Sequence, residues 1–361
     1  MLDNTFYKLT YDKHLSVGYF GGSITEGAGA SDASKTSWRA RVTEWFRTSY
    51  PDAEVAEIYA AIGGTGSDLG MYRCDTDLLA KNPDLVFIEF AVNDSWMNYD
   101  AILMQTETIY RKIRSKNPCA DIVCIITTTA SIASGLEKGG EFTARSAHSV
   151  IAHRYSTPII DVGNILHFEV LKNGGDFLKY TTDTVHPNDE GYTLYTECIA
   201  AYLKMWAQHS SANALTPYTM PVPVCDKVYE NRACMIDCMS ADSFESDGFA
   251  LVETSLCGRY PRYIEAVTPG SSFSFDFTGE TCGFYWMMAK DSGDILVSVD
   301  GGEEKTLSSW DHYCKSFNRA NLAFAAKGLP DGKHHVNVRV ADTKSDESEG
   351  TAIRIGALLI S

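Results

Sequence analysis

The chain has no apolar run long enough to cross a membrane and no leader-like start. None of its 361 residues fall in a stretch that approaches the roughly 18 consecutive apolar residues typical of a membrane-spanning helix. The first twenty residues, MLDNTFYKLTYDKHLSVGYF, lack the basic segment followed by an apolar segment that a secretory signal would show. We therefore expect a cytoplasmic protein.

Positive charge is also scarce. The chain holds 31 Lys and Arg against 47 Asp and Glu, so its formal net charge is -16. Nucleic acid and anionic membranes attract clustered Lys and Arg, and the charge balance argues against both as partners. Low-complexity tracts and internal repeats are absent, and 44% of the residues are hydrophobic. Length and composition are typical of a globular protein with two ordinary domains.

The cysteines follow no metal-binding or disulfide pattern. The ten cysteines are scattered, and several lie in apolar, strand-like runs. Without a secretory signal they are expected to be reduced and mostly buried thiols. Cys234 and Cys238 are the closest pair, but no second cysteine or histidine pair follows at a zinc-like spacing. We expect neither a metal nor an organic cofactor.

The first part of the chain has the alternating pattern of a parallel α/β fold. Between residues 15 and 208, short apolar runs alternate with longer amphipathic ones, which predicts a series of βαβ units. Several apolar runs have no polar face, as expected for strands covered by helices on both sides. We predict a doubly wound, flavodoxin-like domain that binds ligands at the carboxyl ends of its strands. The expected strands cover residues 16–20, 54–60, 84–90, 121–127 and 158–162.

The pattern changes after about residue 210. The segment NALTPYTMPVPVCDK holds three prolines and is typical of a linker or strap. Beyond it, short runs such as SFSFDF, DILVSVD and HHVNVRV are separated by turns, which predicts an antiparallel, jelly-roll-like β-sandwich. The expected boundaries are a catalytic domain at 1–212, a linker at 213–227 and an all-β accessory domain at 228–361.

Two glycine-rich turns follow the first two predicted strands. The first strand runs into GGSITEG, which places Ser23 just past its carboxyl end. The second ends in AAIGGTG, whose backbone N–H groups can face the same crevice as oxyanion donors. A phosphate-binding loop is the rival interpretation, but the pattern GxxxxGK[ST] is absent. Ordinary strand-to-helix turns remain the simpler alternative.

Polar and aromatic side chains follow the third predicted strand. Asn93 comes directly after it, where its side-chain amide could donate to a developing oxyanion. Asp94 either contacts the substrate or caps the next segment. Trp96 and Tyr99 follow in a predicted loop, a place where large aromatic side chains are less expected than in a core.

The segment DTVHPNDEGY places Asp183 three residues before His186. One short loop can then turn the carboxylate onto the imidazole, fix its tautomer and leave the other ring nitrogen facing the serine. The alternative is a loop that only caps the last helix through Asn188 or Asp189, and both can hold at once. The remaining histidines, such as His148, have no acid placed near them by the sequence and are interpreted as structural.

In this order, these residues resemble the blocks of the SGNH (GDSL-like) hydrolase superfamily over residues 15 to about 208. GGSITEG is similar to its first block, IGGTG to its second, VND to its third and DTVHP to its fifth. The resemblance implies an acyl-enzyme mechanism with Ser23 as nucleophile and Asp183 and His186 completing the triad. It further implies an oxyanion hole made by the N–H groups of Ser23 and Gly64 and by the amide of Asn93.

Two positions depart from the family pattern. Gly22 stands where many relatives have Asp, and Tyr59 stands near a position where relatives often have Asn. Neither belongs to the expected triad, so the departures bear on the subfamily and not on the chemistry.

The two-domain order resembles carbohydrate O-acetylesterases in which a carbohydrate-binding-like β-sandwich follows an SGNH domain, including cytosolic mannan acetylesterases of gut bacteria. This implies deacetylation of mannan- or xylan-derived oligosaccharides. Trp96 and Asp94, next to the expected site, are candidate substrate-binding residues. Trp310, in the turn-rich segment SSWDHY, could also bind a sugar or reach over the active site, and core packing or an interdomain contact is an equal alternative for it. Alternatives are a short-chain acyl esterase, a lysophospholipase, a thioesterase, or a carbohydrate-binding protein without activity. The sandwich could instead be a structural module or one that forms a homodimer.

Overall fold

The computed structural model describes residues 2–211, 213–254 and 261–361. These residues divide into two compact units, Met1–Glu230 and Asn231–Ser361. No helix within the described ranges is both long and apolar enough to cross a membrane. Each unit is described by itself below.

The first unit is built on a parallel sheet in the order β2-β1-β3-β4-β5. Every residue of β3 and β4 is buried, which explains why these strands are apolar on both faces. The strand order reverses beside β1, so the carboxyl ends of β1 and β3 flank the crevice in which such folds bind ligands. The strands are β1 (His14–Gly21), β2 (Glu54–Ala61), β3 (Leu85–Glu89), β4 (Asp121–Ile126) and β5 (Ile159–Asp161).

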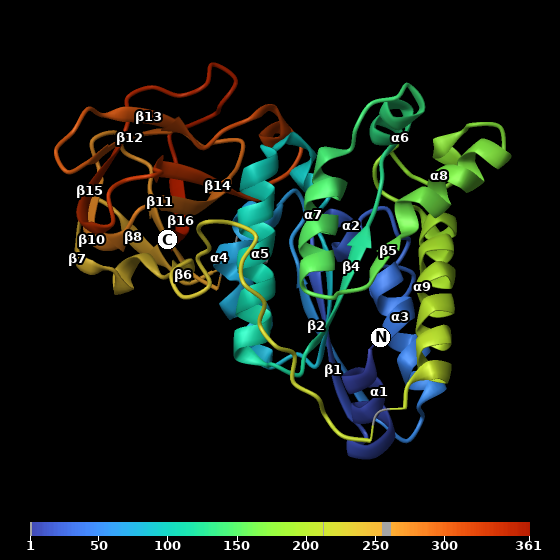
Figure 1. Ribbon diagram of the computed structural model, residues 1–361. Coiled ribbons are helices and arrows are strands. Elements are labelled where there is room, and N and C mark those ends of the chain that lie inside the picture. Colours follow the sequence, from blue (N-terminus) through green and yellow to red (C-terminus); the bar gives the residue numbers. More distant parts are fainter. Residues whose placement is uncertain (1, 212, 255–260) are drawn as a thin grey trace. The chain divides into compact units, whose positions relative to one another are not determined.

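Helices cover both faces of this sheet (Figure 1). Leu15, Val17 and Tyr19 of β1 alternate toward one face, where they join a core with α3, α8 and α9. The helices on that face are α3 (Trp38–Ser49), α8 (Val162–Lys172) and α9 (Asp189–His209). Those on the other face are α4 (Ser67–Arg73), α5 (Tyr99–Lys116) and α7 (Thr143–Arg154). The shorter helices, in which η marks a 3-10 or π-helix, are α1 (Asp3–Tyr7), η1 (Lys8–Asp12), α2 (Ser23–Glu26), η2 (Cys74–Leu78), η3 (Leu79–Lys81), η4 (Asn93–Trp96), α6 (Ala130–Glu137) and η5 (Phe177–Lys179).

The proline-containing segment after α9 lies along the first unit. Tyr218 donates its N–H to the carbonyl of Pro118 at 2.8 Å, and the guanidinium of Arg114 lies 3.3 Å from the centre of the Tyr218 ring. Farther along, the N–H groups of Val224 and Cys225 both donate to the buried carboxylate of Glu107. Residues 213–230 therefore form a strap that belongs to the first unit.

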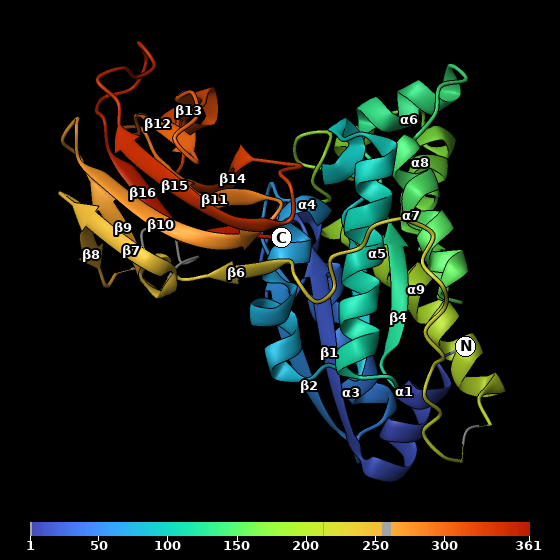
Figure 2. The same cartoon turned by 60° about the vertical axis from the view of Figure 1, so that its left-hand side comes forward.

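The second unit is a β-sandwich of two antiparallel sheets (Figure 2). Their orders are β13-β12-β15-β10-β7 and β14-β11-β16-β9-β8, and β6 pairs with β16. In β10, Phe273, Phe275 and Phe277 point into the core while Ser274 and Asp276 between them are less buried, the alternation expected for a half-buried strand.

The elements of the second unit are short, as in most sandwiches. They are β6 (Cys234–Ile236), η6 (Cys238–Ser240), β7 (Asp242–Asp247), β8 (Ala250–Val252), β9 (Tyr263–Ala266), β10 (Ser272–Gly279), β11 (Cys282–Met288), β12 (Asp294–Val299), β13 (Lys305–Ser308), η7 (His312–Lys315), β14 (Arg319–Ala326), β15 (Gly332–Val340) and β16 (Ile353–Ile360).

Candidate active site

Ser23 begins α2, and only Gly22 separates it from the end of β1 at Gly21. The two positions before it, Gly21 and Gly22, have no room for a side chain. A Cβ atom on Gly21 would lie 2.4 Å from Thr25 Oγ1, and one on Gly22 would lie 2.0 Å from Asn93 Oδ1. Glycine at both positions lets β3 and its following turn approach the serine closely.

Ser23, His186 and Asp183 form a hydrogen-bonded chain. His186 Nε2 lies 2.8 Å from Ser23 Oγ, and His186 Nδ1 lies 2.7 Å from Asp183 Oδ2. Asp183 also accepts the backbone N–H of His186 at 2.8 Å through its other oxygen. The carboxylate thus fixes both the ring and its backbone, the geometry that a serine needs for activation by a neighbouring base.

The loop that carries His186 is anchored on several sides. Thr184 adopts a left-handed conformation with φ 67°, and its carbonyl accepts the N–H of Ala130 at 2.9 Å. Gly29, with φ 87°, lies against the loop, since a Cβ there would be 2.5 Å from the carbonyl oxygen of Pro187. Asn188 then caps α9 by accepting the N–H groups of its first turn. Helix capping and triad placement therefore occur in the same loop.

The surroundings favour the charged form of Asp183. Partial burial raises the pKa of this carboxyl, but hydrogen bonds from the backbone and ring of His186 and from the Val185 N–H outweigh it, so the net pKa lies below its usual value. A carboxylate that stays ionised can stabilise an imidazolium formed on His186.

The two expected oxyanion elements lie beside the serine. Gly64 has φ 73°, and a Cβ on the preceding Gly63 would be in ordinary contact with Ser23, 3.5 Å from its Cβ. Asn93 begins η4, and its side chain reaches the space beside Gly22. The loops that carry Gly64 and Asn93 therefore approach the turn of Ser23 at the carboxyl edge of the sheet, and both residues stay candidates for the oxyanion donors that such a site requires.

Asp94 does not face a substrate. It is 0% exposed, and its two oxygens are occupied by the N–H of Ser67 at 2.8 Å and by His148 Nε2 at 2.7 Å. The expectation that Asp94 binds substrate is therefore corrected to an internal role. His148, interpreted from the sequence as structural, is buried here and has an acid partner that the sequence did not place, because α7 packs beside η4.

The two tryptophans expected to bind substrate differ in exposure. Trp96 is 91% exposed at the end of η4, three residues after Asn93. Trp310, in the second unit, is partly buried against that unit's core, and its ring nitrogen is buried without a hydrogen-bond partner. Trp310 thus packs against the core of the second unit, one of the alternatives that the sequence left open for it. Tyr99 begins α5 and is half-buried.

A buried carboxyl beneath the nucleophile turn was missed by sequence reasoning. Glu89 ends β3 and accepts hydrogen bonds from Thr25 Oγ1 at 2.8 Å and from Thr127 Oγ1 at 2.7 Å. Burial raises its pKa to about 7, although the two threonine hydrogen bonds lower it. The available signal was an acidic residue inside the apolar run DLVFIEF.

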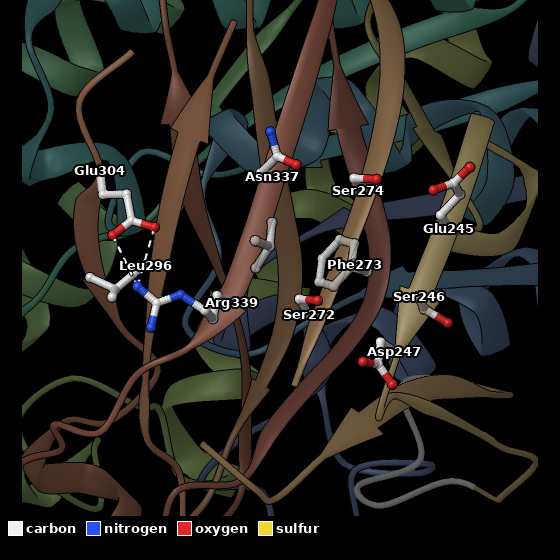
Figure 3. Close-up of a pocket in the computed structure, with 11 residues that line it drawn as sticks. Glu245, Ser246, Asp247, Ser272, Phe273, Ser274, Leu296, Glu304, Asn337 and Arg339 are labelled. Atoms are coloured by element: carbon white, nitrogen blue, oxygen red, sulfur yellow. Dashed lines mark hydrogen bonds and ion pairs between the residues drawn. The ribbon is translucent and has the colours of Figure 1, made fainter. Parts of the chain in front are cut away.

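The outer face of one sheet of the second unit carries a depression of about 390 Å³ (Figure 3). Side chains of β7, β10 and β15 line it, and Arg339 at one side pairs with Glu304 at 3.1 Å. Most of the lining is polar, with Ser272, Ser274 and Asn337 along its floor. No sequence pattern indicated this hollow.

Within the described ranges, no group of three or more His, Cys, Asp or Glu side chains is arranged to hold a metal. Nine of the ten cysteines are free thiols, and Cys257 lies outside the described residues.

Residues 19–194 match the model of the GDSL-like Lipase/Acylhydrolase family. The first unit is thus a GDSL/SGNH hydrolase domain. An acetylxylan esterase of Geobacillus stearothermophilus is 32% identical over 100 residues, which cover 26% of this chain and 45% of that enzyme, so the chain spans about half the length of this relative.

The two-unit architecture is similar to that of a solved two-domain esterase (CEX) active on acetylated mannans. That structure superposes with a TM-score of 0.84 at 22% identity, covering 99% of this chain and 95% of the other. A crystal of the same esterase with mannopentaose superposes with a TM-score of 0.82 at 22% identity, covering 96% of this chain and 91% of the other. The α/β domain followed by a β-sandwich is therefore a shared fold.

Proposed function

We propose that the protein is a serine esterase that removes O-acetyl groups from oligosaccharides derived from mannan or xylan. One observation carries the esterase chemistry: Ser23 Oγ lies 2.8 Å from His186 Nε2, while Asp183 holds the opposite ring nitrogen at 2.7 Å. This is the arrangement of a nucleophile, a general base and the group that orients the base.

In the proposed first step, Ser23 Oγ attacks the acetyl carbonyl carbon while His186 Nε2 accepts the hydroxyl proton. The N–H groups of Ser23 and Gly64 and the amide of Asn93 stabilise the oxyanion that forms. The bond between the carbonyl carbon and the sugar oxygen then breaks, and His186 returns the proton to that oxygen. Deacetylated sugar leaves, and the acetyl group remains on Ser23.

In the second step, water replaces the sugar. His186 accepts a proton from the water as its oxygen attacks the acetyl-serine carbonyl, and the same donors stabilise the second oxyanion. Collapse of this intermediate breaks the bond between the carbonyl carbon and Ser23 Oγ, and His186 returns the proton to that oxygen. The acetic acid that leaves loses its own proton to solvent and becomes acetate. Asp183, held ionised by its hydrogen bonds, stabilises the imidazolium in both steps.

The substrate class rests on the surroundings of the site and on the relatives. Trp96 is 91% exposed beside Asn93, and an exposed indole offers a flat apolar surface on which a sugar ring can stack. The relatives named above act on acetylated xylan and acetylated mannans. A carbohydrate acetyl ester fits both lines of support.

The direct test is acetate release from acetylated manno- and xylo-oligosaccharides by the full chain. Ser23→Ala serves as the control, and a series of p-nitrophenyl esters reports the preferred acyl length. We expect release that disappears in Ser23→Ala, with acetyl preferred over longer acyl groups. Turnover of long acyl esters alone would instead identify a lysophospholipase or thioesterase. If the unaltered protein hydrolyses none of these esters, the interpretation as a carbohydrate-binding protein without activity would replace the esterase.

We also propose that the second unit binds oligosaccharide in the depression of Figure 3. Its serines, asparagine and acidic side chains offer donors and acceptors to sugar hydroxyl groups. Calorimetric titration of mannopentaose into full-length Ser23→Ala, with and without the added change Asn337→Ala, tests this. Weaker binding after Asn337→Ala is expected, and unchanged affinity would contradict it. A homodimer and a cytoplasmic location stay predictions from the sequence.

A further inference from the structure

A second Asp–His pair lies buried behind the site. Asp94 is 0% and His148 is 1% exposed, and Asp94 Oδ2 lies 2.7 Å from His148 Nε2. Asp94 Oδ1 accepts the backbone N–H of Ser67 at 2.8 Å. The proposed reaction uses neither residue, although burying a carboxylate is costly unless it is paired and hydrogen-bonded.

The Asp94 carboxylate connects the two loops that carry the expected oxyanion donors. Asp94 directly follows Asn93 in η4, and Ser67 begins α4 directly after the loop that contains Gly64. The approach is close: a Cβ on Gly66 would lie 2.3 Å from Asp94 Oδ1. One carboxylate therefore fixes the distance between a side-chain donor and a backbone donor.

His148 orients that carboxylate from a different helix. It lies on α7, and its Nδ1 is 3.5 Å from Thr106 Oγ1 on α5. Because Oδ1 is engaged by Ser67, the His148 ring is the group that holds Oδ2. Without a donor at position 148, the buried Oδ2 would lose its hydrogen bond and the carboxylate could turn away from Ser67.

We propose that Asp94 and His148 are positioning residues that hold the Asn93 and Gly64 donors at the separation an oxyanion requires; this rests on the esterase function proposed above. Donors aimed at developing charge stabilise the transition state more than the bound substrate. The pair therefore acts on kcat and leaves KM nearly unchanged.

The experiment compares two replacements of one side chain. His148→Leu keeps much of the volume but has no donor, whereas the amide of His148→Gln can still donate to Asp94. We expect His148→Leu to lower kcat by about tenfold to hundredfold, a smaller decrease than the loss of a whole oxyanion donor causes. KM should stay within about twofold of the value for the unaltered protein. His148→Gln should recover most of that loss. Ile151→Val, buried on the same helix, is the control for a general packing defect.

A second pair of variants covers the case in which position 148 tolerates no change. Ser67→Pro removes the N–H that Asp94 accepts at the first helical position, where proline is tolerated. Ser67→Ala keeps that N–H and loses only the hydroxyl bond to Gln105. A kcat that falls in Ser67→Pro and holds in Ser67→Ala supports the proposal.

Equal loss in His148→Leu and His148→Gln, or a change in KM instead of kcat, would overturn the positioning role. That outcome differs from failure of the proposed function. If the proposed function is wrong, the unaltered protein cleaves no ester, or the Ser23→Ala variant cleaves esters as well as the unaltered protein does. Activity that depends on Ser23 but is unchanged by His148→Leu and Ser67→Pro refutes the positioning role alone.

Discussion

The hydroxyl of Tyr192, in the first turns of α9, donates to the carbonyl oxygen of Ala28 at 2.7 Å. The same hydroxyl lies 3.1 Å from the carbonyl of Ile24, the residue after Ser23. A single phenol thus ties the helix that follows His186 to the turn that carries Ser23. The distance between these two site residues depends on this contact, which comes from outside the triad.

Removing that hydroxyl should loosen the triad. Tyr192→Phe keeps the ring in place but leaves the two carbonyls without their shared donor, at a cost of about 1–3 kcal/mol in unfolding free energy. We expect kcat to fall several-fold. Urea unfolding and steady-state kinetics measure the two effects. Tyr195→Phe removes another buried hydroxyl from α9 and is the control, because no hydrogen bond among the described residues joins that hydroxyl to the turn of Ser23. Wild-type kcat in Tyr192→Phe would contradict the coupling.

Truncating Asn93 should remove one oxyanion donor. Loss of one such donor typically lowers kcat by about 10²–10³. We expect Asn93→Ala to lose activity to that extent while its thermal unfolding stays cooperative and near that of the parent. A folded Asn93→Ala with nearly normal kcat would show that the amide is not an oxyanion donor.

A methyl group at Gly22 should displace the Asn93 amide. The new Cβ would lie 2.0 Å from Asn93 Oδ1, so one of the two must move. We expect Gly22→Ala to lower kcat by at least about tenfold, since a displaced donor stabilises the oxyanion less. Gly135→Ala on α6 is the matched control, because no atom lies within 4 Å of its added Cβ. Similar kinetics in the two variants would argue against the close approach.

Glu89 should make a contribution to stability that falls as pH rises. Burial raises the pKa of Glu89 to about 7 in the folded state, above the value of about 4.3 for an unperturbed Glu. The folded state therefore binds the proton more tightly, and this group lowers stability progressively between about pH 4.3 and 7. Above pH 7 the cost is about 3–4 kcal/mol.

Replacing Glu89 by Gln should remove this pH dependence. Relative to the parent, Glu89→Gln gains stability on going from pH 4 to pH 8, which chemical unfolding at both values measures. Glu303→Gln, at an exposed carboxyl, is the control. Parallel stability curves for parent and Glu89→Gln would mean that Glu89 is ionised in the folded protein at acidic pH.

Trp96 should affect oligosaccharides and not small esters. An exposed indole beside the site can contact the sugar but is not needed for the acyl group. We expect Trp96→Ala to raise KM for acetylated oligosaccharides about tenfold, with p-nitrophenyl acetate turnover unchanged. Tyr11→Ala alters an exposed aromatic residue that precedes β1 and serves as control. An equal effect on both substrates would indicate that Trp96 positions Asn93 and does not contact the sugar.

Local pattern was sufficient for the sheet and for the order of the site residues. The central strands are apolar on both faces, so the predicted runs 84–90 and 121–127 contain the observed β3 and β4. Ser23, Asp183 and His186 could be selected because each follows a recognisable strand or precedes a helix. The polar strand β7, DSFESD, could not be predicted, since none of its residues is buried and no apolar alternation marks it.

The remaining features depend on contacts between distant parts of the chain. His148 meets Asp94 across 54 positions because α7 packs beside η4, and no local signal reports that packing. The choice between packing and sugar binding for Trp310 stayed open for a similar reason: its turn-forming neighbours do not report that it packs against the sandwich core.

The strap sets where the chain can be divided. Glu107 is fully buried and receives the N–H groups of Val224 and Cys225 together with the Tyr155 hydroxyl. A cut at the end of α9 would leave this carboxylate with one of its three donor residues. The hydrolase domain therefore extends through Glu230. If the sandwich is exchanged for another domain during evolution, the strap has to stay with the hydrolase domain.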